Sequence, residues 1–446
     1  MGLAIYRAAE SCGGIVAPPE VNSRRRRSLA GLYLATVAPA LAACQGSAVT
    51  VAAEPVYASN VASSLDFCMT REQGRVVPAD PANYQALIPK LTAGQTLLLA
   101  PGEYRRLVIA NIRGAPGRCI TITGPTGSRR ATIFGEIGNK TVEIIGSSYV
   151  VVSNLVIDSR DVPGADGIKA PGTTQGATHH VVVDGNLIIG AGASQQTDGI
   201  STKTATWNWI IRRNTIVGAG TAMYLGDSDG TAPFIAGLIE NNLILDPIGY
   251  GLQIKFQADR PLIPGMPGGA QSTIIRNNVF KKDDRPSPEG DRPNLLVGGF
   301  PATGPGSGDI YQIYENLFVD NPREALFQGS GRISFHDNVL IGGRPAAAVF
   351  KDHDLPLKLV EVFDNKIYSP QVGIQFGSPA REHLSVFGNI IFAAVPIAGV
   401  DTSEQDKLVF AVPPVYGAFA STVPNLSAPT GVRGPPTDEL FVFATR

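Results

Sequence analysis

Short apolar strands recur along this chain, and each pair of strands is organised around an asparagine. In every copy, alternating apolar residues precede two variable positions, an Asn and a second apolar strand, as in VVVDGNLII and WIIRRNTIV. The spacing between copies varies, which excludes a repeat of fixed length and favours a solenoid with a constant core and unequal loops. The repeated residues are Asn186, Asn214, Asn242, Asn278, Asn316, Asn338, Asn365 and Asn389, and Asn154 marks a degenerate earlier copy.

A third short strand accompanies these pairs, in GIKA, GISTK, AMYLG, GLQIKF, NLLVGG and GIQFG. Three short strands per repeat and few helical stretches predict an all-β fold, namely a right-handed single-stranded parallel β-helix of about nine or more coils. We expect the asparagine amides to form a hydrogen-bonded ladder from coil to coil. We also expect the Asn backbone to supply the left-handed conformation that a tight bend needs.

The ends of the solenoid follow from changes in composition. NYQALIPKLTAG predicts an N-terminal capping helix, which covers a sheet edge that would otherwise be open. The β-helix is predicted over residues 67–410, after a linker at 44–66. The Pro/Gly-rich residues 411–446 are predicted to form a C-terminal cap or tail.

The Asn-centred repeat and the stretch LLLAPGEY resemble the pectin-lyase-like superfamily of parallel β-helix proteins, over residues 67 to about 400. The resemblance implies a parallel β-helix fold. It also implies that sugar polymers bind along an outer face of the coils, between the adjoining loops. Activity has to be argued from the site, because one fold supports many functions.

Composition narrows the partners. The chain has 446 residues, of which 43% are hydrophobic, so it can bury a large core. Its net charge of −1 and the lack of a concentrated basic patch after residue 43 argue against nucleic acid as a partner. The chain also lacks a Walker loop and a clustered Cys/His metal site. We expect a monomer.

The first 43 residues predict export. Four arginines, Arg24 to Arg27, precede an apolar run over 29–43, which is shorter than the roughly 20 residues that span a bilayer. LAAC before Gln45 resembles a bacterial lipobox, which implies acylation of Cys44 and a place in the cell envelope, in the periplasm or on the outer membrane. In that oxidising compartment Cys68 and Cys119 are predicted to form a disulfide.

Alternation sorts the residues of the third strands into two faces. Ile168, Ile200, Met223 and Leu252 are predicted to point inward. Lys169, Ser201, Tyr224 and Gln253 are predicted to point outward, with Lys203 and Lys255 in a second outward column. The longest insertions, at 257–273, 281–293 and 299–310, lie beside these strands, and long loops on neighbouring coils favour a functional groove there.

The stretch QTDGISTKT resembles the alginate lyase and chondroitinase B family in a segment of about 40 residues. That resemblance implies calcium ligands at Gln196, Asp198 and Asp166, with Lys203 at the position of the catalytic lysine. Gly226 and Asp227 stand where the family carries an arginine. The activity it implies is β-elimination from a polymer that contains uronate.

β-Elimination requires a base for the C5 proton, neutralisation of the carboxylate and an acid for the leaving oxygen. Lys203, or Lys255 as runner-up, is predicted to be the base, because a lysine with a lowered pKa can accept a proton. Tyr224 or Arg260 is predicted to assist the leaving group. The predicted calcium ligands are Asp166, Asp198, Asp227 and Asp229, whose oxygens suit Ca²⁺.

Two other functions stay open. QTDGI also resembles the Asn-Thr-Asp-Gly-Ile motif of polygalacturonase-type inverting glycoside hydrolases, although the next coil lacks their Asp-Asp pair. The missing family arginine instead favours a non-catalytic envelope protein that binds glycan or a partner. The lyase is the preferred interpretation, and its expected partner is an acidic polysaccharide. Lys169, Ser201 and Gln253 are predicted to bind that polysaccharide.

Overall fold

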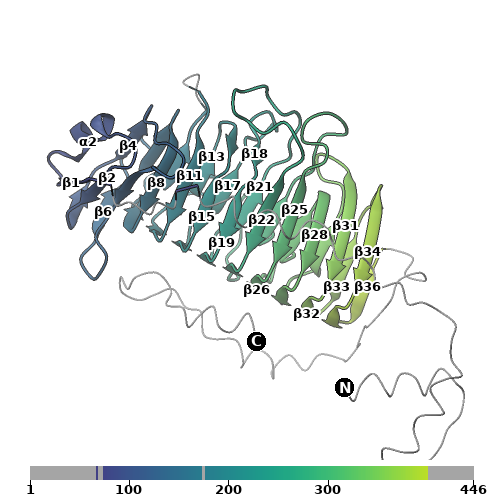
Figure 1. The fold of residues 1–446 in the computed structure, drawn as a ribbon. Helices are drawn as coiled ribbons and strands as arrows, with labels where there is room; N and C mark the ends of the chain where they lie inside the picture. Colours follow the sequence, from purple (N-terminus) through teal and green to yellow (C-terminus); the bar gives the residue numbers. More distant parts are fainter. Residues whose placement is uncertain (1–66, 69–73, 173–175, 400–446) are drawn as a thin grey trace, which may run out of the picture. The chain divides into compact units, whose positions relative to one another are not determined.

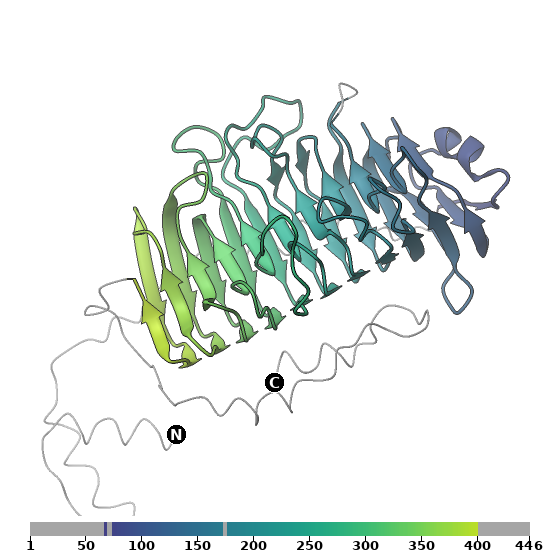
Figure 2. The same ribbon diagram turned by 180° about the vertical axis from the view of Figure 1, so that it is seen from behind.

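The chain winds into a solenoid of parallel strands (Figures 1 and 2). The computed structural model describes residues 67–68, 74–172 and 176–399. Within them, successive coils contribute strands to three sheets, here called A, B and C, of 12, 11 and 11 strands. Every strand pairs in parallel with the corresponding strand of the next coil. The fold is the right-handed parallel β-helix that the repeat predicts.

The strands of each sheet follow the order of the coils. Sheet A contains β1 (Val76–Ala79), β2 (Thr96–Leu99), β5 (Ile120–Thr123), β8 (Ser148–Ser153), β11 (His179–Asp184), β15 (Ile210–Arg212), β19 (Leu238–Glu240), β22 (Ser272–Arg276), β25 (Ile310–Tyr314), β28 (Gly331–His336), β31 (Leu357–Phe363) and β34 (His383–Phe387). Sheet B contains β3 (Gly102–Tyr104), β6 (Ala131–Phe134), β9 (Leu155–Asp158), β12 (Leu187–Ile189), β16 (Thr215–Val217), β20 (Leu243–Leu245), β23 (Val279–Lys281), β26 (Leu317–Val319), β29 (Val339–Ile341), β32 (Lys366–Tyr368) and β35 (Ile390–Phe392).

Sheet C carries the strands on which the sequence places the candidate site. It contains β4 (Leu107–Ala110), β7 (Val142–Ile145), β10 (Ile168–Ala170), β13 (Asp198–Thr202), β17 (Thr221–Leu225), β21 (Leu252–Ile254), β24 (Leu295–Val297), β27 (Phe327–Gly329), β30 (Ala346–Phe350), β33 (Val372–Phe376) and β36 (Val395–Ala398). A separate two-stranded sheet joins β14 (Thr206–Trp207) to β18 (Phe234–Ile235).

Sheet C confirms the predicted inward column. Ile168 pairs with Ile200, Ile200 with Met223, and Met223 with Leu252, and all four side chains are fully buried. Each such side chain contributes about 1.5–3 kcal/mol by leaving water. Because one-residue slips would turn these side chains outward, the buried column fixes the register and therefore the outward column as well.

A ladder of buried asparagines runs along the turn between sheets A and B. From Asn214 onward, each ladder Asn accepts two hydrogen bonds at Oδ1 from the preceding ladder Asn, one from its backbone N–H and one from its Nδ2. Between Asn214 and Asn242 both bonds measure 3.0 Å. The Nδ2 of Asn242 also donates to the carbonyl of Ile211 in the preceding coil, at 2.8 Å. The amides are therefore satisfied inside the core, where an unpaired polar group is costly.

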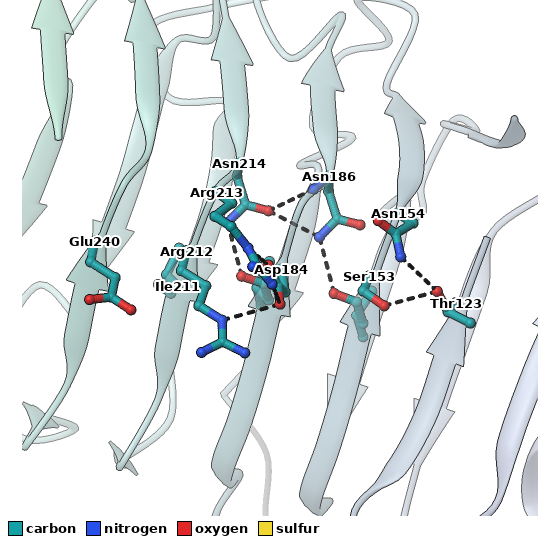
Figure 3. A network of polar contacts seen from close by, with 12 residues as sticks. Thr123, Ser153, Asn154, Asp184, Asn186, Ile211, Arg212, Arg213, Asn214 and Glu240 are labelled. Atoms are coloured by element: carbon teal, nitrogen blue, oxygen red, sulfur yellow. Dashed lines mark hydrogen bonds and ion pairs between the residues drawn. The ribbon is translucent and has the colours of Figure 1, made fainter. Parts of the chain in front are cut away.

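The left-handed residue of this turn is not the ladder asparagine. It is the residue immediately before, for example Arg213 at φ 54° and Glu315 at φ 54°. Asn154 occupies this preceding position at φ 54°, and its Nδ2 donates to Thr123 Oγ1 instead of joining the ladder (Figure 3). The expectation that the ladder asparagines bend the backbone is therefore wrong. Their role is to pair side chains along the axis.

The N-terminal end has a shorter helix than the sequence suggests. NYQALIPK forms one α-helical turn, α2 (Tyr84–Leu87), followed by a 3-10 turn, η1 (Ile88–Lys90). Strand β1 precedes this segment, so the helix lies after the first strand of sheet A rather than before it. Tyr84 is buried and donates to the backbone carbonyls of Arg105 and Arg106 at 3.1 Å, which attaches the segment to the first coils.

Several predictions concern residues near or beyond the ends of the described chain. Cys68 and Cys119 form a disulfide with Cα atoms 5.3 Å apart. The signal peptide, Cys44, the linker at 44–66 and the tail at 411–446 lie outside the described residues. In the part of the chain that the structure describes, no helix is long and apolar enough to cross a membrane.

The ladder predicts a large effect of one amide on stability. Replacing the fully buried Asn242 by Ala leaves two buried donors of Asn214 without their acceptor. We expect the free energy of unfolding to fall by about 2–4 kcal/mol, because each orphaned buried donor costs about 1–3 kcal/mol and the turn partly relaxes. Urea unfolding followed by circular dichroism measures the loss.

Asn139→Ala is the matched control, because the Asn139 amide lies in a loop and makes a 3.5 Å contact with the carbonyl of Ile137. A loss at Asn242 no larger than the loss at Asn139 would contradict the structural role of the ladder.

Candidate active site on the outer face of sheet C

The candidate site lies on outward residues of β10, β13, β17 and β21. The outward column is confirmed by the register, in which Lys169 pairs with Ser201, Ser201 with Tyr224, and Tyr224 with Gln253. Where these strands end, continuing the register by two residues aligns Lys203, Gly226 and Lys255. We call these three residues the lysine row. Strands of a sheet lie about 4.8 Å apart, so the two lysine backbones are about 10 Å apart across Gly226.

Long loops border this face. They connect β21 to β22, β23 to β24 and β24 to β25, and the ribbon shows loops gathered along one edge of the coils (Figures 1 and 2). The loop before β24 is held to an earlier coil, because Gln195 accepts from the backbone of Glu289 at 2.9 Å and donates to the carbonyl of Gly290 at 3.0 Å. Contacts across more than 90 residues of sequence therefore fix one border of the site.

Lys203 stands against the ring of Tyr224. Its Nζ lies 3.2 Å from the ring centroid, a cation–π contact. Burial lowers the pKa of Lys203 to about 8, and the charge of Lys169 adds to that effect, whereas the carboxylates of Asp198 and Asp227 oppose it. The Tyr224 hydroxyl is 3.0 Å from Ser228 Oγ, and burial raises the pKa of Tyr224 above 10.0. The site thus places an amine that can accept a proton beside a phenol that keeps its own.

Two buried carboxyl groups, Asp166 and Asp198, act on Lys203 through their charges. Asp166 Oδ2 accepts from Lys169 Nζ at 2.5 Å and is 3.2 Å from Lys140 Nζ. Its Oδ1 accepts from the backbone N–H of Asp198 at 2.9 Å. Burial and the charge of Asp166 raise the pKa of Asp198 to about 7, although Lys169 and Lys203 oppose the rise. Asp198 therefore acts on Lys203 through charge, because only 4% of its surface is exposed.

Lys255 occupies the other end of the lysine row. Its Nζ is 3.7 Å from Asp354 Oδ2 and 5.3 Å from the ring centroid of Phe256. Gly226 is left-handed at φ 88°, and a Cβ there would stand 3.3 Å from the Lys255 Cβ, which is tighter than an ordinary contact. The two lysines of the row are thus separated by a residue that carries no side chain.

Arg260 is not available to a substrate. Its guanidinium pairs with Asp309 and donates to the carbonyls of Pro267 and Gly269, at 2.8 Å each. Its side chain is 2% exposed. Arg260 therefore holds the loop between β21 and β22 in place, and the structure does not support the predicted catalytic role.

The predicted binding residues differ in accessibility. Ser201 is fully buried and Gln253 is 5% exposed, because neighbouring side chains cover this part of the outward column. The Lys169 ammonium is paired with Asp166. Ser201 thus lacks the surface for direct contact with a polymer, whereas Tyr224, Lys169 and the two lysines of the row are partly exposed.

Three of the predicted calcium ligands accept hydrogen bonds or ion pairs from neighbouring groups of the chain. Asp227 and Asp229 both accept hydrogen bonds from Thr231 within one turn, whereas Asp166 is engaged by two lysines and a backbone N–H. Among the described residues, no group of three or more His, Cys, Asp or Glu side chains is arranged to hold a metal. Calcium binding by these aspartates stays a prediction, and the reaction steps proposed for this site involve only side chains of the chain itself.

Three residues join the site that the sequence reasoning missed. Asp354 comes from the loop after β30, whereas Tyr250 and Arg292 precede β21 and β24. The Arg292 guanidinium carbon lies 5.6 Å from the Tyr250 ring centroid. The charge of Asp354 and the phenol of Tyr224 both raise the pKa of Tyr250, after the larger effect of burial. Only the stacking of coils places these residues together, although the charged loops themselves are visible in the sequence.

The chain matches no protein-family profile and no curated protein in sequence. In structure it is similar to an alginate lyase from Paenibacillus sp. (15% identity, 76% of this chain and 99% of that chain, TM-score 0.43). It is also similar to a pectate lyase (10% identity, 80% and 86%, TM-score 0.47). The A-module of an Azotobacter vinelandii mannuronan C-5 epimerase gives 16% identity, 78% and 98% coverage, and a TM-score of 0.45. These likenesses concern the fold, and the activities named belong to those proteins.

The coupling of Asp198 to Lys203 is testable directly. In Asp198→Asn the largest charge that raises the pKa of Lys203 is removed, so we expect this pKa to fall below about 8. Reductive methylation with ¹³C-formaldehyde, followed by NMR across pH 6 to about 11, reports the titration of each lysine. The Lys203 resonance is assigned by its loss in Lys203→Met, and an unchanged or raised pKa would contradict the arrangement.

Proposed function

We propose that this protein is a polysaccharide lyase that cleaves uronate-containing polymers by β-elimination on the outer face of sheet C. The observation that carries the proposal is the contact between Lys203 Nζ and the Tyr224 ring, at 3.2 Å, with the Lys203 pKa lowered to about 8. A half-buried amine of this kind is a competent base at mildly alkaline pH. The adjacent phenol is a competent acid in the same range, because its pKa is raised.

The reaction needs one proton to be removed and one to be delivered. Neutral Lys203 takes the proton from C5 of the uronate, next to its carboxylate. The electron pair of that C–H bond forms the C4–C5 double bond, and the bond between C4 and the glycosidic oxygen breaks. The Tyr224 hydroxyl gives its proton to that leaving oxygen. The products are an unsaturated uronate end and a free hydroxyl on the other fragment.

Lys255 is assigned the role of binding the uronate carboxylate of the substrate. Loss of the C5 proton places negative charge on the carboxylate, and a nearby cation lowers the energy of that intermediate. In the register Lys203 and Lys255 lie on either side of Gly226, so a uronate whose carboxylate binds the Lys255 ammonium can present its C5 proton to the neutral amine of Lys203. This division of roles explains why two lysines share the row without both acting as bases.

An inverting glycoside hydrolase is the second candidate. It is favoured by one observation, the pKa of about 7 of Asp198 beside Asp166, because a carboxyl group with a raised pKa can act as a general acid. The burial of both carboxyl groups, at 4% and 2% exposed, leaves little surface for a glycosidic bond. The lyase therefore remains the preferred function. Export and attachment through Cys44 accompany it as proposals.

The first test follows the ultraviolet absorbance of unsaturated uronate ends on alginate, polygalacturonate and glycosaminoglycans. We expect the wild-type protein to produce it, and Lys203→Met and Tyr224→Phe to lower kcat by about 10²–10⁴-fold, as for a lost general base or acid. Lys255→Met is expected to lower kcat/KM. Calcium chloride and a chelator are compared in parallel, and a loss of activity on chelation that calcium chloride restores would show that the predicted calcium ligands act in the reaction.

Lys351→Met is the matched control. Lys351 follows β30 as Lys255 follows β21, but it lies three strands further along sheet C. Its loss is expected to leave kcat unchanged. Full activity of Lys203→Met would refute the assignment of the base. New reducing ends without the absorbance would show hydrolysis, and binding without turnover would show a glycan-binding protein.

The pH profile gives an independent check. Lys203 must be neutral, so kcat/KM is expected to rise with pH up to about 8 and then level off. It is expected to fall again where Tyr224 ionises, above 10.0. Steady-state kinetics from pH 6 to about 11 measure the profile. A rate that falls through pH 8 would show that the protonated lysine is the active form.

A further inference from the structure

Asp354 reaches the lysine row from a distant coil. It lies in the loop after β30, three strands along sheet C from β21. Its Oδ2 is 3.7 Å from Lys255 Nζ and 2.9 Å from His353 Nδ1. Its backbone is left-handed at φ 58°, a conformation that aspartate and asparagine adopt more readily than most residues. The loop is thus shaped so that this carboxylate faces the ammonium of Lys255.

The position of Asp354 coincides with the candidate site. Its negative charge contributes to the raised pKa of Tyr224, which pairs with Gln253 in the register, and to that of Tyr250, which precedes β21. The Asp354 side chain is 37% exposed, whereas that of Lys255 is 13% exposed. An incoming anion therefore meets the lysine with a protein carboxylate already beside it.

We propose that Asp354 is a specificity-determining residue, whose carboxylate holds the place of a substrate carboxylate at Lys255 until a polyanion displaces it. The proposal rests on the lyase function proposed above, through the role of Lys255. It adds that the site discriminates against isolated anions. A tethered carboxylate competes at a high effective concentration, so a single free carboxylate binds poorly. A polymer offers several contacts at once and can displace Asp354.

The test is the affinity for sodium polygalacturonate and alginate, and for free galacturonate, measured by isothermal titration calorimetry on the purified protein. Asp354→Asn retains the shape and the left-handed backbone but removes the charge. We expect it to bind the polymer about two- to fivefold more tightly, in keeping with the usual strength of a partly exposed ion pair. We also expect galacturonate to bind measurably to this variant.

Asp337→Asn is the matched control. Asp337 is also left-handed, at φ 52°, and its Oδ2 is 2.8 Å from His336 Nδ1, but it follows β28 in sheet A. Its affinity for the polymer is expected to equal that of the wild type. A second control combines Asp354→Asn with Lys255→Met. The gain in affinity is expected to vanish in this variant, because the ammonium for which Asp354 and the substrate carboxylate compete is absent.

The outcomes separate this inference from the lyase proposal. Tighter binding by Asp354→Asn without ultraviolet absorbance supports the inference and removes the lyase. Turnover with unchanged or weaker affinity in Asp354→Asn overturns the inference and leaves the lyase. An equal gain in Asp337→Asn, or a gain that survives Lys255→Met, also overturns it, and so does the absence of binding by every variant.

Discussion

The hydrogen bonds between successive ladder asparagines determine where each coil turns, and the rest of the structure depends on that position. From Asn214 onward, each buried Oδ1 accepts from the backbone and the side chain of the preceding ladder Asn, as between Asn278 and Asn316 at 3.0 Å for both bonds. Such a double contact is satisfied in only one register, because a slip would leave amides unpaired in the core. A fixed turn between sheets A and B fixes the coil that follows, and therefore the residues of sheet C that share a row. Lys203 and Lys255 are aligned by contacts made on another side of the solenoid.

Burial then gives the aligned residues their chemistry. It disfavours the charged form of each group, so it lowers the pKa of Lys203 to about 8 and raises that of Asp198 to about 7. The two values have moved toward each other, which brings an amine and a carboxyl group into the range where small changes in charge shift a proton. The Tyr224 ring, in contact with the Lys203 ammonium, adds apolar surface as well as a cation–π contact. Burial is thus the main cause of the lowered pKa of Lys203.

The same covering limits which predicted residues can meet a substrate. Alternation correctly predicts that Ser201 and Gln253 face outward, but facing outward is not exposure, and both are covered by neighbours. Arg260 looks available in the sequence because it lies in a long loop, yet it pairs with Asp309, 49 residues later, and becomes a buried support. The predicted calcium ligands show the same effect of tertiary contacts. Asp166 and Asp229 are engaged by lysines, a backbone N–H group and a threonine that the linear pattern does not place beside them.

The sequence by itself determined the β-helix, the asparagine ladder, the inward and outward columns of sheet C, and the long loops beside β21 and β24. These features rest on local periodicity, which is written in residues two positions or one coil apart. Lys203 and Tyr224 could be named for the same reason, since they lie on adjacent coils. The tertiary structure alone decided that the residue before each ladder Asn is the left-handed one, that Arg260 is buried, and that Asp354 stands at Lys255. Those outcomes depend on contacts between side chains from different coils and on how far these contacts exclude water. Residues that meet in this way have no fixed spacing in the sequence.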